Sequence, residues 1–249
     1  MSEILAAQNL SFSYPGGENL FAEVSFSLQR GEVLGVIGPS GCGKSTLALA
    51  LCGIIPHSLE GVMGGHVFLL GENTRKLTLP QIATRAGIVF QDPETQLFLP
   101  EIRHELAFGP ENLCLPREEI ASVIAEVAGM TDMEHLMPHN PNEISGGQQQ
   151  LVALAAVLCL DPDLLILDEV ASQLDEETGA LILEVIGRLK RKGKAMVMID
   201  HNLSRLGLAD RILVMGSGRI HAIGCPQDIL KDRALLERCF GEPDRGAAS

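Results

Sequence analysis

A glycine-rich segment near residue 40 severely limits the folds open to this chain. It reads Gly38-Pro39-Ser40-Gly41-Cys42-Gly43-Lys44-Ser45 and fits the pattern G-x-x-x-x-G-K-[ST] in full. An apolar run at 33–37 precedes it, and a stretch at 45–52, rich in Leu and Ala, follows it. We therefore expect a buried strand, a loop whose N–H groups face phosphate oxygens, and a helix that ends at Gly53.

Within this loop, Lys44 can reach the β- and γ-phosphates of a nucleotide, and the Ser45 hydroxyl can ligate Mg²⁺. The neighbouring Thr46 is expected to contact the nucleotide as well. The alternative is a glycine-rich turn that binds nothing. The complete match, placed between a strand and a helix, disfavours that alternative.

A second site pattern is a strand that ends in two acids. Leu164 to Leu167 are apolar, and Asp168 and Glu169 follow them directly. Ligands in open α/β sheets bind at the carboxyl ends of the strands. Asp168 is therefore expected to hold Mg²⁺ through a water, and Glu169 is expected to orient or deprotonate an attacking water. A solvated turn is the weaker alternative.

The order of the remaining elements indicates an α/β core that is interrupted by helices. Of the 249 residues, 46% are hydrophobic, Trp is absent and Tyr occurs once, so aliphatic runs must build the buried parallel strands. Strands 4–12 and 24–28 alternate as antiparallel strands do, with Gly16-Gly17 as a turn between them. Further strands are expected at 33–37, 88–90, 164–167, 195–199, 212–215 and 219–222, and helices at 45–52, 120–128, 148–160 and 177–191.

The charge of the chain narrows its partners. A formal net charge of −13 repels the phosphates of nucleic acid and anionic lipid headgroups, so neither is expected to bind. The N-terminus lacks the pattern of a secretion signal, and the apolar run 151–160 is too short to span a bilayer. We expect no direct lipid insertion. The six cysteines form no C-x-x-C pair and are interpreted as reduced thiols that pack in the interior.

The segment Ile144-Ser145-Gly146-Gly147-Gln148 is more selective than the phosphate loop. Ser145 and Gln148 fit a capping box, and the two glycines leave helical N–H groups open to an anion. An ordinary helix start would explain these features by themselves. The segment, however, resembles the L-S-G-G-Q signature of the ABC ATPases and lies a short interval before the acid-tipped strand, as in that family.

Other motifs of that family follow in order along the chain. Gln91 resembles the Q-loop glutamine, Asp175 the acid of the D-loop in Ser172-Gln173-Leu174-Asp175, and His201 the switch histidine that contacts the γ-phosphate. Tyr14 stands where the family has an aromatic residue that stacks on adenine. The resemblance covers residues 4–230 and implies ATP and Mg²⁺ as cofactors. The implied catalytic residues are Glu169, His201 and Gln91, and the implied metal ligands are Ser45, Gln91 and Asp168.

The resemblance also implies a fold and a domain plan. The fold is an α/β P-loop NTPase (RecA-like) core with an N-terminal antiparallel β subdomain and an inserted α-helical subdomain. Residues 1–249 form a single ABC ATPase domain. The core and the antiparallel subdomain occupy 1–91 and 161–225, the helical subdomain 92–160, and a short C-terminal helical tail 226–249. Two such domains pair head to tail, so that Ser145, Gly146, Gly147 and Gln148 of one subunit cover the ATP of the other.

Two further stretches resemble the ATPases of energy-coupling-factor transporters, which import vitamins and cobalt or nickel ions in prokaryotes. They are Phe90-Gln91-Asp92-Pro93-Glu94-Thr95-Gln96-Leu97-Phe98 and Glu105-Leu106-Ala107-Phe108-Gly109-Pro110-Glu111-Asn112-Leu113. The implied partners are a second ATPase subunit, identical or paralogous, a transmembrane coupling protein and a membrane substrate-binding protein. The implied location is peripheral, on the cytoplasmic face of a prokaryotic cell membrane.

The chain departs from the family pattern in four places that bear on turnover and pairing. Leu151 replaces an Arg, Val170 replaces a Pro, and Asp200-His201-Asn202 replaces Thr-His-Asp. The sequence also ends at Ser249, without the longer C-terminal extension of many relatives. Two rival functions are a soluble ABC ATPase in translation or repair and a binding-only module. One cassette and acidity disfavour the first, and an intact Glu169 and His201 disfavour the second. The ATPase of another ABC importer class is a further alternative.

Two expectations concern surfaces. Cys42 is either a thiolate, favoured by Lys44 and the helix N-terminus, or a buried inert thiol. The apolar residues that follow Gln91 either fill a small helical core or partly line a groove for a helix of the coupling protein. They are Leu97, Phe98, Leu99, Pro100, Leu106, Ala107 and Phe108, and Glu94, Glu101 and Glu105 are expected to pair with cations on that helix.

Overall fold

Two β-sheets form the framework of the computed structural model, which describes residues 2–172 and 174–240. Gln173 of the D-loop motif and residues 241–249 of the expected tail lie outside the described residues. The larger sheet has six strands in the order β10-β9-β3-β8-β7-β6, with β3 parallel to β8 and β9. Its strands are β3 (Val33–Ile37), β6 (Ala86–Val89), β7 (Leu164–Asp168), β8 (Ala195–Ile199), β9 (Arg211–Gly216) and β10 (Arg219–Gly224).

The smaller sheet has four antiparallel strands in the order β2-β1-β4-β5. They are β1 (Glu3–Ser13), β2 (Phe21–Gln29), β4 (Val62–Leu69) and β5 (Glu72–Asn73). The sequence did not predict β4, because Gly64 and Gly65 interrupt its apolar alternation. Gly65 has φ +73° and approaches the Asn9 carbonyl of β1 so closely that a side chain would collide with it. The irregular pairing of β1 with β4 thus depends on a residue that sequence periodicity does not reveal.

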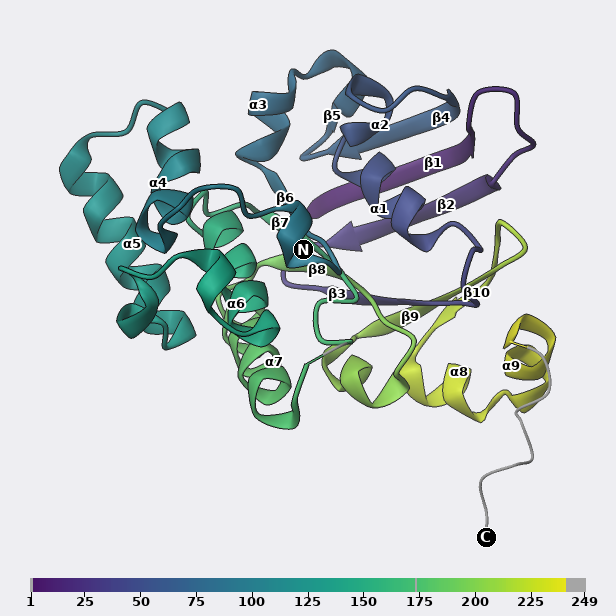
Figure 1. Ribbon diagram of the computed structural model, residues 1–249. Coiled ribbons are helices and arrows are strands. Elements are labelled where there is room, and N and C mark those ends of the chain that lie inside the picture. The colour runs from purple at the N-terminus through teal and green to yellow at the C-terminus, as the bar shows by residue number, and fades with distance from the viewer. Residues whose placement is uncertain (1, 173, 241–249) are drawn as a thin grey trace, which may run out of the picture.

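The helices surround the larger sheet (Figure 1). In Figure 1, α6 and α7 lie against the sheet, α4 and α5 lie beyond them at the left, and α8 and α9 lie at the lower right. The α-helices are α1 (Lys44–Leu51), α2 (Ile54–His57), α3 (Leu79–Ala83), α4 (Ile102–Asn112), α5 (Arg117–Thr131), α6 (Gly146–Leu158), α7 (Glu176–Arg191), α8 (Pro226–Lys231) and α9 (Arg233–Phe240). Short 3₁₀ helices are η1 (Thr74–Lys76), η2 (Pro93–Thr95), η3 (Glu134–Leu136), η4 (Pro141–Glu143) and η5 (Leu203–Leu208).

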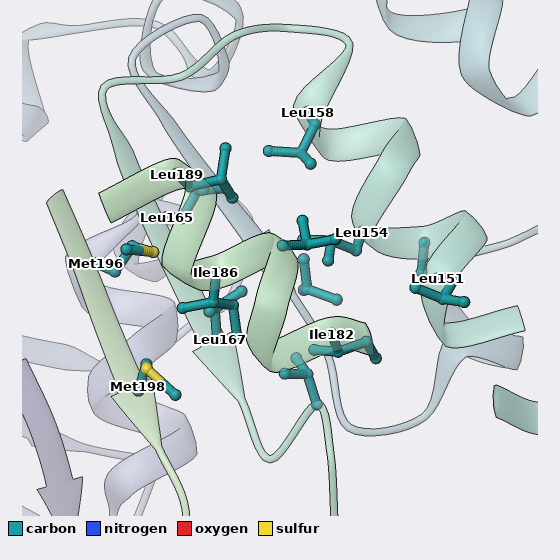
Figure 2. Packing of buried hydrophobic residues seen from close by; sticks show 14 of the residues in the cluster. Leu151, Leu154, Leu158, Leu165, Leu167, Ile182, Ile186, Leu189, Met196 and Met198 are labelled. Atoms are coloured by element: carbon teal, nitrogen blue, oxygen red, sulfur yellow. The ribbon is translucent and has the colours of Figure 1, made fainter. Parts of the chain in front are cut away.

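The strands β3, β7 and β8 of the larger sheet are buried throughout. Along β7, Leu165 and Leu167 belong to the core shared with α6 and α7, whereas Leu164 and Ile166 belong to the core shared with α1 and the smaller sheet. Figure 2 shows residues of the first of these cores, among them Leu154 of α6, Leu189 of α7 and Met196 of β8. Burial on both faces explains why these strands are aliphatic throughout rather than alternating.

This architecture confirms the predicted α/β fold. The strand β3, the glycine-rich loop and α1 follow one another as expected, and the helices α4, α5 and α6 interrupt the core after β6. Within the described residues, none of the helices has the length and apolar character needed to cross a membrane. Because β3, β7 and β8 are parallel, their carboxyl ends lie at one edge of the larger sheet, beside the glycine-rich loop.

Candidate active site

The glycine-rich loop forms one wall of a cavity of about 310 Å³. Lys44 is buried, and its ammonium donates to the carbonyls of Gly38 at 2.9 Å and Pro39 at 3.0 Å. These two bonds hold the ammonium inside the loop. The described residues that line the cavity are Leu20, Ser40, Gly41, Gly43, Lys44, Ser45, Thr46 and Glu169. The loop and Glu169, which follows β7, therefore face one space.

Two glycines of this loop are required by the geometry. A Cβ on Gly38 would lie 2.3 Å from the carbonyl oxygen of Met215, so no side chain fits there. Gly43 precedes α1 with φ +100°, a conformation that residues with a side chain rarely adopt. The close approach at Gly38 and the positive φ at Gly43 let the backbone of the loop curve around the start of α1, where it can surround an anion.

Asp168 ends β7 as a buried carboxylate beside the loop. Among the described residues, its Oδ1 atom is buried without a hydrogen-bond partner. Burial raises the pKa of Asp168, the repulsion from Glu169 acts in the same direction, and a hydrogen bond from Ser45 and the charge of Lys44 oppose them. An acceptor oxygen left without a partner in the interior fits a bound cation, so Asp168 and the Ser45 hydroxyl are suited to hold Mg²⁺.

Glu169 and His201 lie together at the edge of the sheet. The Glu169 backbone N–H donates to Ile199 of β8 at 2.9 Å, and its φ of +52° is left-handed. Nδ1 of His201 lies 3.4 Å from Oε2 of Glu169. A carboxylate and an imidazole, placed next to a phosphate-sized cavity, can accept and return a proton during hydrolysis.

Tyr14 lies beside α1. Its hydroxyl is 3.3 Å from Oγ1 of Thr46, and its ring meets Phe12 edge-on with the ring centroids 5.0 Å apart. The side chain is otherwise exposed. An aromatic face open to solvent and fixed at its hydroxyl end is a suitable surface for a flat heterocycle.

Gln91 follows β6 and shares a second, smaller cavity of about 160 Å³ with Glu169 and Gly146. The two cavities meet at Glu169, which lines both. The structure therefore brings Gln91 near Glu169.

The other residues of the sequence prediction form helix starts. Ser145 caps α6 by accepting from the Gln148 N–H at 3.3 Å, and the Gln148 side chain accepts from the Ser145 N–H at 3.0 Å. Asp175 caps α7 by accepting from the N–H and the hydroxyl of Thr178, which lowers the pKa of Asp175. In the part of the chain that the structure describes, neither Ser145–Gln148 nor Asp175 lines the cavity of Lys44.

Three polar side chains hold the segment between β6 and α4 through contacts that the sequence did not predict. Gln150 of α6 donates to the Phe90 carbonyl at 2.9 Å. Gln96 accepts from the Phe90 N–H at 3.3 Å and donates to the Ile88 carbonyl at 3.1 Å. Glu105 of α4 is buried and accepts from the N–H groups of both Phe98 and Leu99. Backbone contacts of this kind leave no periodic signal in a sequence.

Several expectations need correction or can now be decided. Glu105 was expected to pair with cations of a partner, which is wrong because it is buried and bonded to the backbone of its own chain. Burial raises the pKa of the Cys42 thiol despite the opposing effect of Lys44, which favours the inert thiol. Leu151 and Val170, two departures from the family pattern, are buried in the core shared with α6 and α7.

Comparison with known proteins agrees with this geometry. A family model described as ABC transporter matches residues 21–172. The energy-coupling factor transporter ATP-binding protein EcfA of Methanosarcina acetivorans is 41% identical over 233 residues, which cover 93% of this chain and 83% of that protein. A protein of the same name from Methanothermobacter thermautotrophicus is 37% identical and is covered over 75% of its length.

A solved structure shows the same fold. CbiO1 of Clostridium perfringens, described as part of the ABC transporter complex CbiONQ, superposes with a TM-score of 0.82. It is 28% identical in sequence, and the match covers 96% of this chain and 94% of that one.

The fold and its relatives thus define an α/β enzyme that hydrolyses ATP. The chain belongs to the ABC transporter family. The resemblance to the ATPases of energy-coupling-factor transporters is confirmed by the relatives that carry this name.

Proposed function

We propose that this chain is the motor subunit of an energy-coupling-factor importer and drives uptake of a vitamin or a transition-metal ion through partner membrane proteins. The observation that carries the proposal is the gathering of Lys44, Glu169 and Thr46 around one cavity, with His201 beside Glu169. The names of the relatives supply the transport class. ATP is the fuel, and the imported substrate is bound by another polypeptide.

In this proposal ATP binds with its phosphates in the loop of residues 38–45 and its adenine on Tyr14. The phosphates replace the carbonyls of Gly38 and Pro39 as partners of Lys44, which exchanges neutral acceptors for charged ones. Ser45, Gln91 and Asp168 hold Mg²⁺, with Asp168 acting through a water. The cation neutralises phosphate charge when it is bound. The buried, unpaired oxygen of Asp168 supports its share in that site.

Glu169 acts as the general base. It takes a proton from the water that attacks the γ-phosphate, and His201 contacts that phosphate. The 3.4 Å separation of His201 Nδ1 and Glu169 Oε2 supports a joint action of the two groups. Gln91 is the third group of this set and links the site to the segment that leads to α4.

Hydrolysis requires a second ATPase subunit in this proposal. Ser145 and Gly146 are exposed at the start of α6, and their helix N-terminus is open to an anion. They lie outside the described lining of the Lys44 cavity, so a second copy or a paralogue, paired head to tail, supplies the matching surface. Asp175 lies at this same interface.

The membrane partner docks near α4. Phe98 is 64% exposed, Phe108 is 45% exposed, and their rings meet edge-on at 5.0 Å. Leu106 and Ala107 are buried, so only part of the apolar stretch is core. An exposed aromatic pair beside the Gln91 segment is suited to receive an apolar helix of the coupling protein. Glu94 and Glu101 remain near that surface to select basic partners.

The proposed location is the cytoplasmic face of a prokaryotic membrane, where the protein is held by its partners. A net charge of −13 opposes direct adsorption to anionic lipid. Attachment therefore depends on a protein surface rather than on lipid.

The test is uptake in cells that encode this chain, using a tagged copy that replaces the native one. The wild type is expected to co-purify with membrane subunits and to support ATP-dependent uptake of one radiolabelled vitamin or metal ion. Phe98→Asp is expected to keep ATP hydrolysis and to lose both the co-purification with membrane subunits and the uptake. Val62→Asp is the matched control, because Val62 is an apolar residue, 71% exposed, on the smaller sheet.

Three results would count against the proposal. Hydrolysis with no membrane subunits attached would favour a soluble ABC ATPase. Co-purification with a different set of membrane proteins would favour another importer class. Equal loss of uptake in both aspartate variants would contradict a docking surface at Phe98.

A further inference from the structure

Asp200 is an unusual residue at the end of β8, because the family pattern has Thr at this position. Its side chain is only 6% exposed. Its backbone N–H donates to the Val36 carbonyl of β3 at 3.3 Å, so the residue is tied to the central strand. Burying a carboxylate is unfavourable unless hydrogen-bonding or charged partners stabilise it, and the partners of Asp200 indicate its role.

The closest partner of the Asp200 carboxylate is the backbone two residues ahead. Oδ1 accepts from the Asn202 N–H at 2.7 Å, which closes a turn around His201. Arg205 of η5 lies 3.7 Å from Oδ2 and offsets the charge. The carboxylate thus shapes the backbone on either side of His201.

His201 needs such support, because packing does not hold it. Its side chain is 60% exposed. Nδ1 nevertheless lies 3.4 Å from Oε2 of Glu169 and 3.9 Å from Oδ1 of Asp200. Two acceptor oxygens facing the same ring nitrogen favour the proton on Nδ1, which leaves Nε2 as the nitrogen available to a ligand.

We propose that Asp200 is a positioning residue for ATP hydrolysis: its turn presents His201 to Glu169 with Nδ1 as the donor. The inference rests on the proposed roles of Glu169 and His201. Asp200 itself touches neither ATP nor the water. Its contribution is the orientation of an exposed ring, and misplacing a catalytic group by a small distance lowers turnover far more than it weakens binding.

The experiment compares side chains that can and cannot accept the Asn202 N–H. Asp200→Thr and Asp200→Val have nearly the same shape, and only the Thr hydroxyl can accept this bond. Asp200→Asn keeps a side-chain oxygen acceptor at the same position and removes the negative charge. We expect kcat to fall about 10- to 100-fold in Asp200→Val, with KM for ATP within about twofold of the wild type. Asp200→Asn and Asp200→Thr are expected to keep most of the turnover.

The matched control is Asn73→Ala. Asn73 of β5, on the smaller sheet, accepts from the Arg75 N–H at 3.0 Å in the same kind of turn. Its loss should leave kcat unchanged. Melting temperatures of all variants, measured without nucleotide, separate loss of fold from loss of orientation.

The outcomes distinguish this inference from the proposed function. Equal kcat in Asp200→Thr and Asp200→Val would overturn it, and so would an Asp200→Asn variant as slow as Asp200→Val, because charge would then be the cause. Full turnover in His201→Ala would instead contradict the proposed role of His201. A slow His201→Ala together with a wild-type kcat in Asp200→Val would contradict the positioning role of Asp200 and leave the role of His201 intact.

Discussion

Glu169 can be tested in isolation, because glutamine keeps its size and removes only its basicity. Glu169→Gln is expected to lower ATP turnover by about two to four orders of magnitude while ATP still binds. Phosphate release and ATP binding, measured on the same sample, check this. Lys44→Ala is the contrasting variant and should lose binding itself. Near-normal phosphate release from Glu169→Gln would assign the base elsewhere.

The raised pKa of Asp168 has a consequence for stability. Burial disfavours the ionised carboxylate in the folded state, so its cost is fully present above the raised folded pKa and disappears below the usual aspartate pKa. Asp168→Asn should therefore stabilise the Mg²⁺-free protein at neutral pH, by about 1–3 kcal/mol at most, and the gain should shrink on acidification. Thermal melting in EDTA across this pH range checks the sign.

The same variant should respond less to its ligand. Wild-type protein is expected to gain melting temperature with Mg²⁺ and ATP, and Asp168→Asn should gain much less because it has lost a metal ligand. If Asp168→Asn melted below the wild type in EDTA at neutral pH, the carboxylate would be stabilising, contrary to the cause given for its pKa.

Tyr14 is expected to contribute its ring rather than its hydroxyl. Tyr14→Ala should raise the KM for ATP about three- to tenfold with little change in kcat, because stacking contributes about 0.5–1.5 kcal/mol beyond area burial. Tyr14→Phe keeps the ring and loses only the contact with Thr46, so its KM should stay near the wild-type value. An unchanged KM in Tyr14→Ala would leave Tyr14 with a structural role alone.

At the scale of elements, the segment between β6 and α4 depends on Glu105. Glu105→Ala leaves the N–H groups of Phe98 and Leu99 without their acceptor and should lower the free energy of unfolding by about 1–3 kcal/mol. Denaturant unfolding measures this. Glu101→Ala is the control, since Glu101 is more exposed and, among the described residues, forms an ion pair only with His104, at 4.0 Å. Equal effects in the two variants would contradict the special role of Glu105.

The sequence predicted elements well wherever periodicity or a motif marked them. The helix expected at 177–191 is α7 at Glu176–Arg191, and the strand expected at 195–199 is β8. The sequence did not predict β4, because its glycines interrupt the alternation. It also did not predict the role of Glu105, because a carboxylate that binds backbone N–H groups cannot be told by sequence from any other charged helical residue. The loop residues 38–45 were predictable because each has a local steric or electrostatic reason. The tasks of Gln96 and Gln150 were not, since they depend on chain segments brought together only by the fold.

At the scale of the whole molecule, net charge opposes the proposed pairing of two subunits. Two copies that each carry −13 repel one another, and salt screens this repulsion over about 8 Å at physiological ionic strength. Glu169→Gln with ATP should therefore pair more strongly at 300 mM than at 20 mM salt, the reverse of an interface held by ion pairs. Size-exclusion chromatography with light scattering checks the direction. Weaker pairing at high salt would indicate that attraction between opposite charges dominates.

At Glu169, whose backbone is left-handed, selection for stability opposes selection for activity. Asparagine adopts a φ near +52° more readily than glutamate, and it would also end the repulsion of Asp168. On the proposed role of Glu169, the Glu169→Asn substitution would stabilise the protein and end ATP hydrolysis. A gene copy released from its task is thus expected to drift away from glutamate at this position early. A laboratory screen that rewards heat resistance alone should select the same inactive protein.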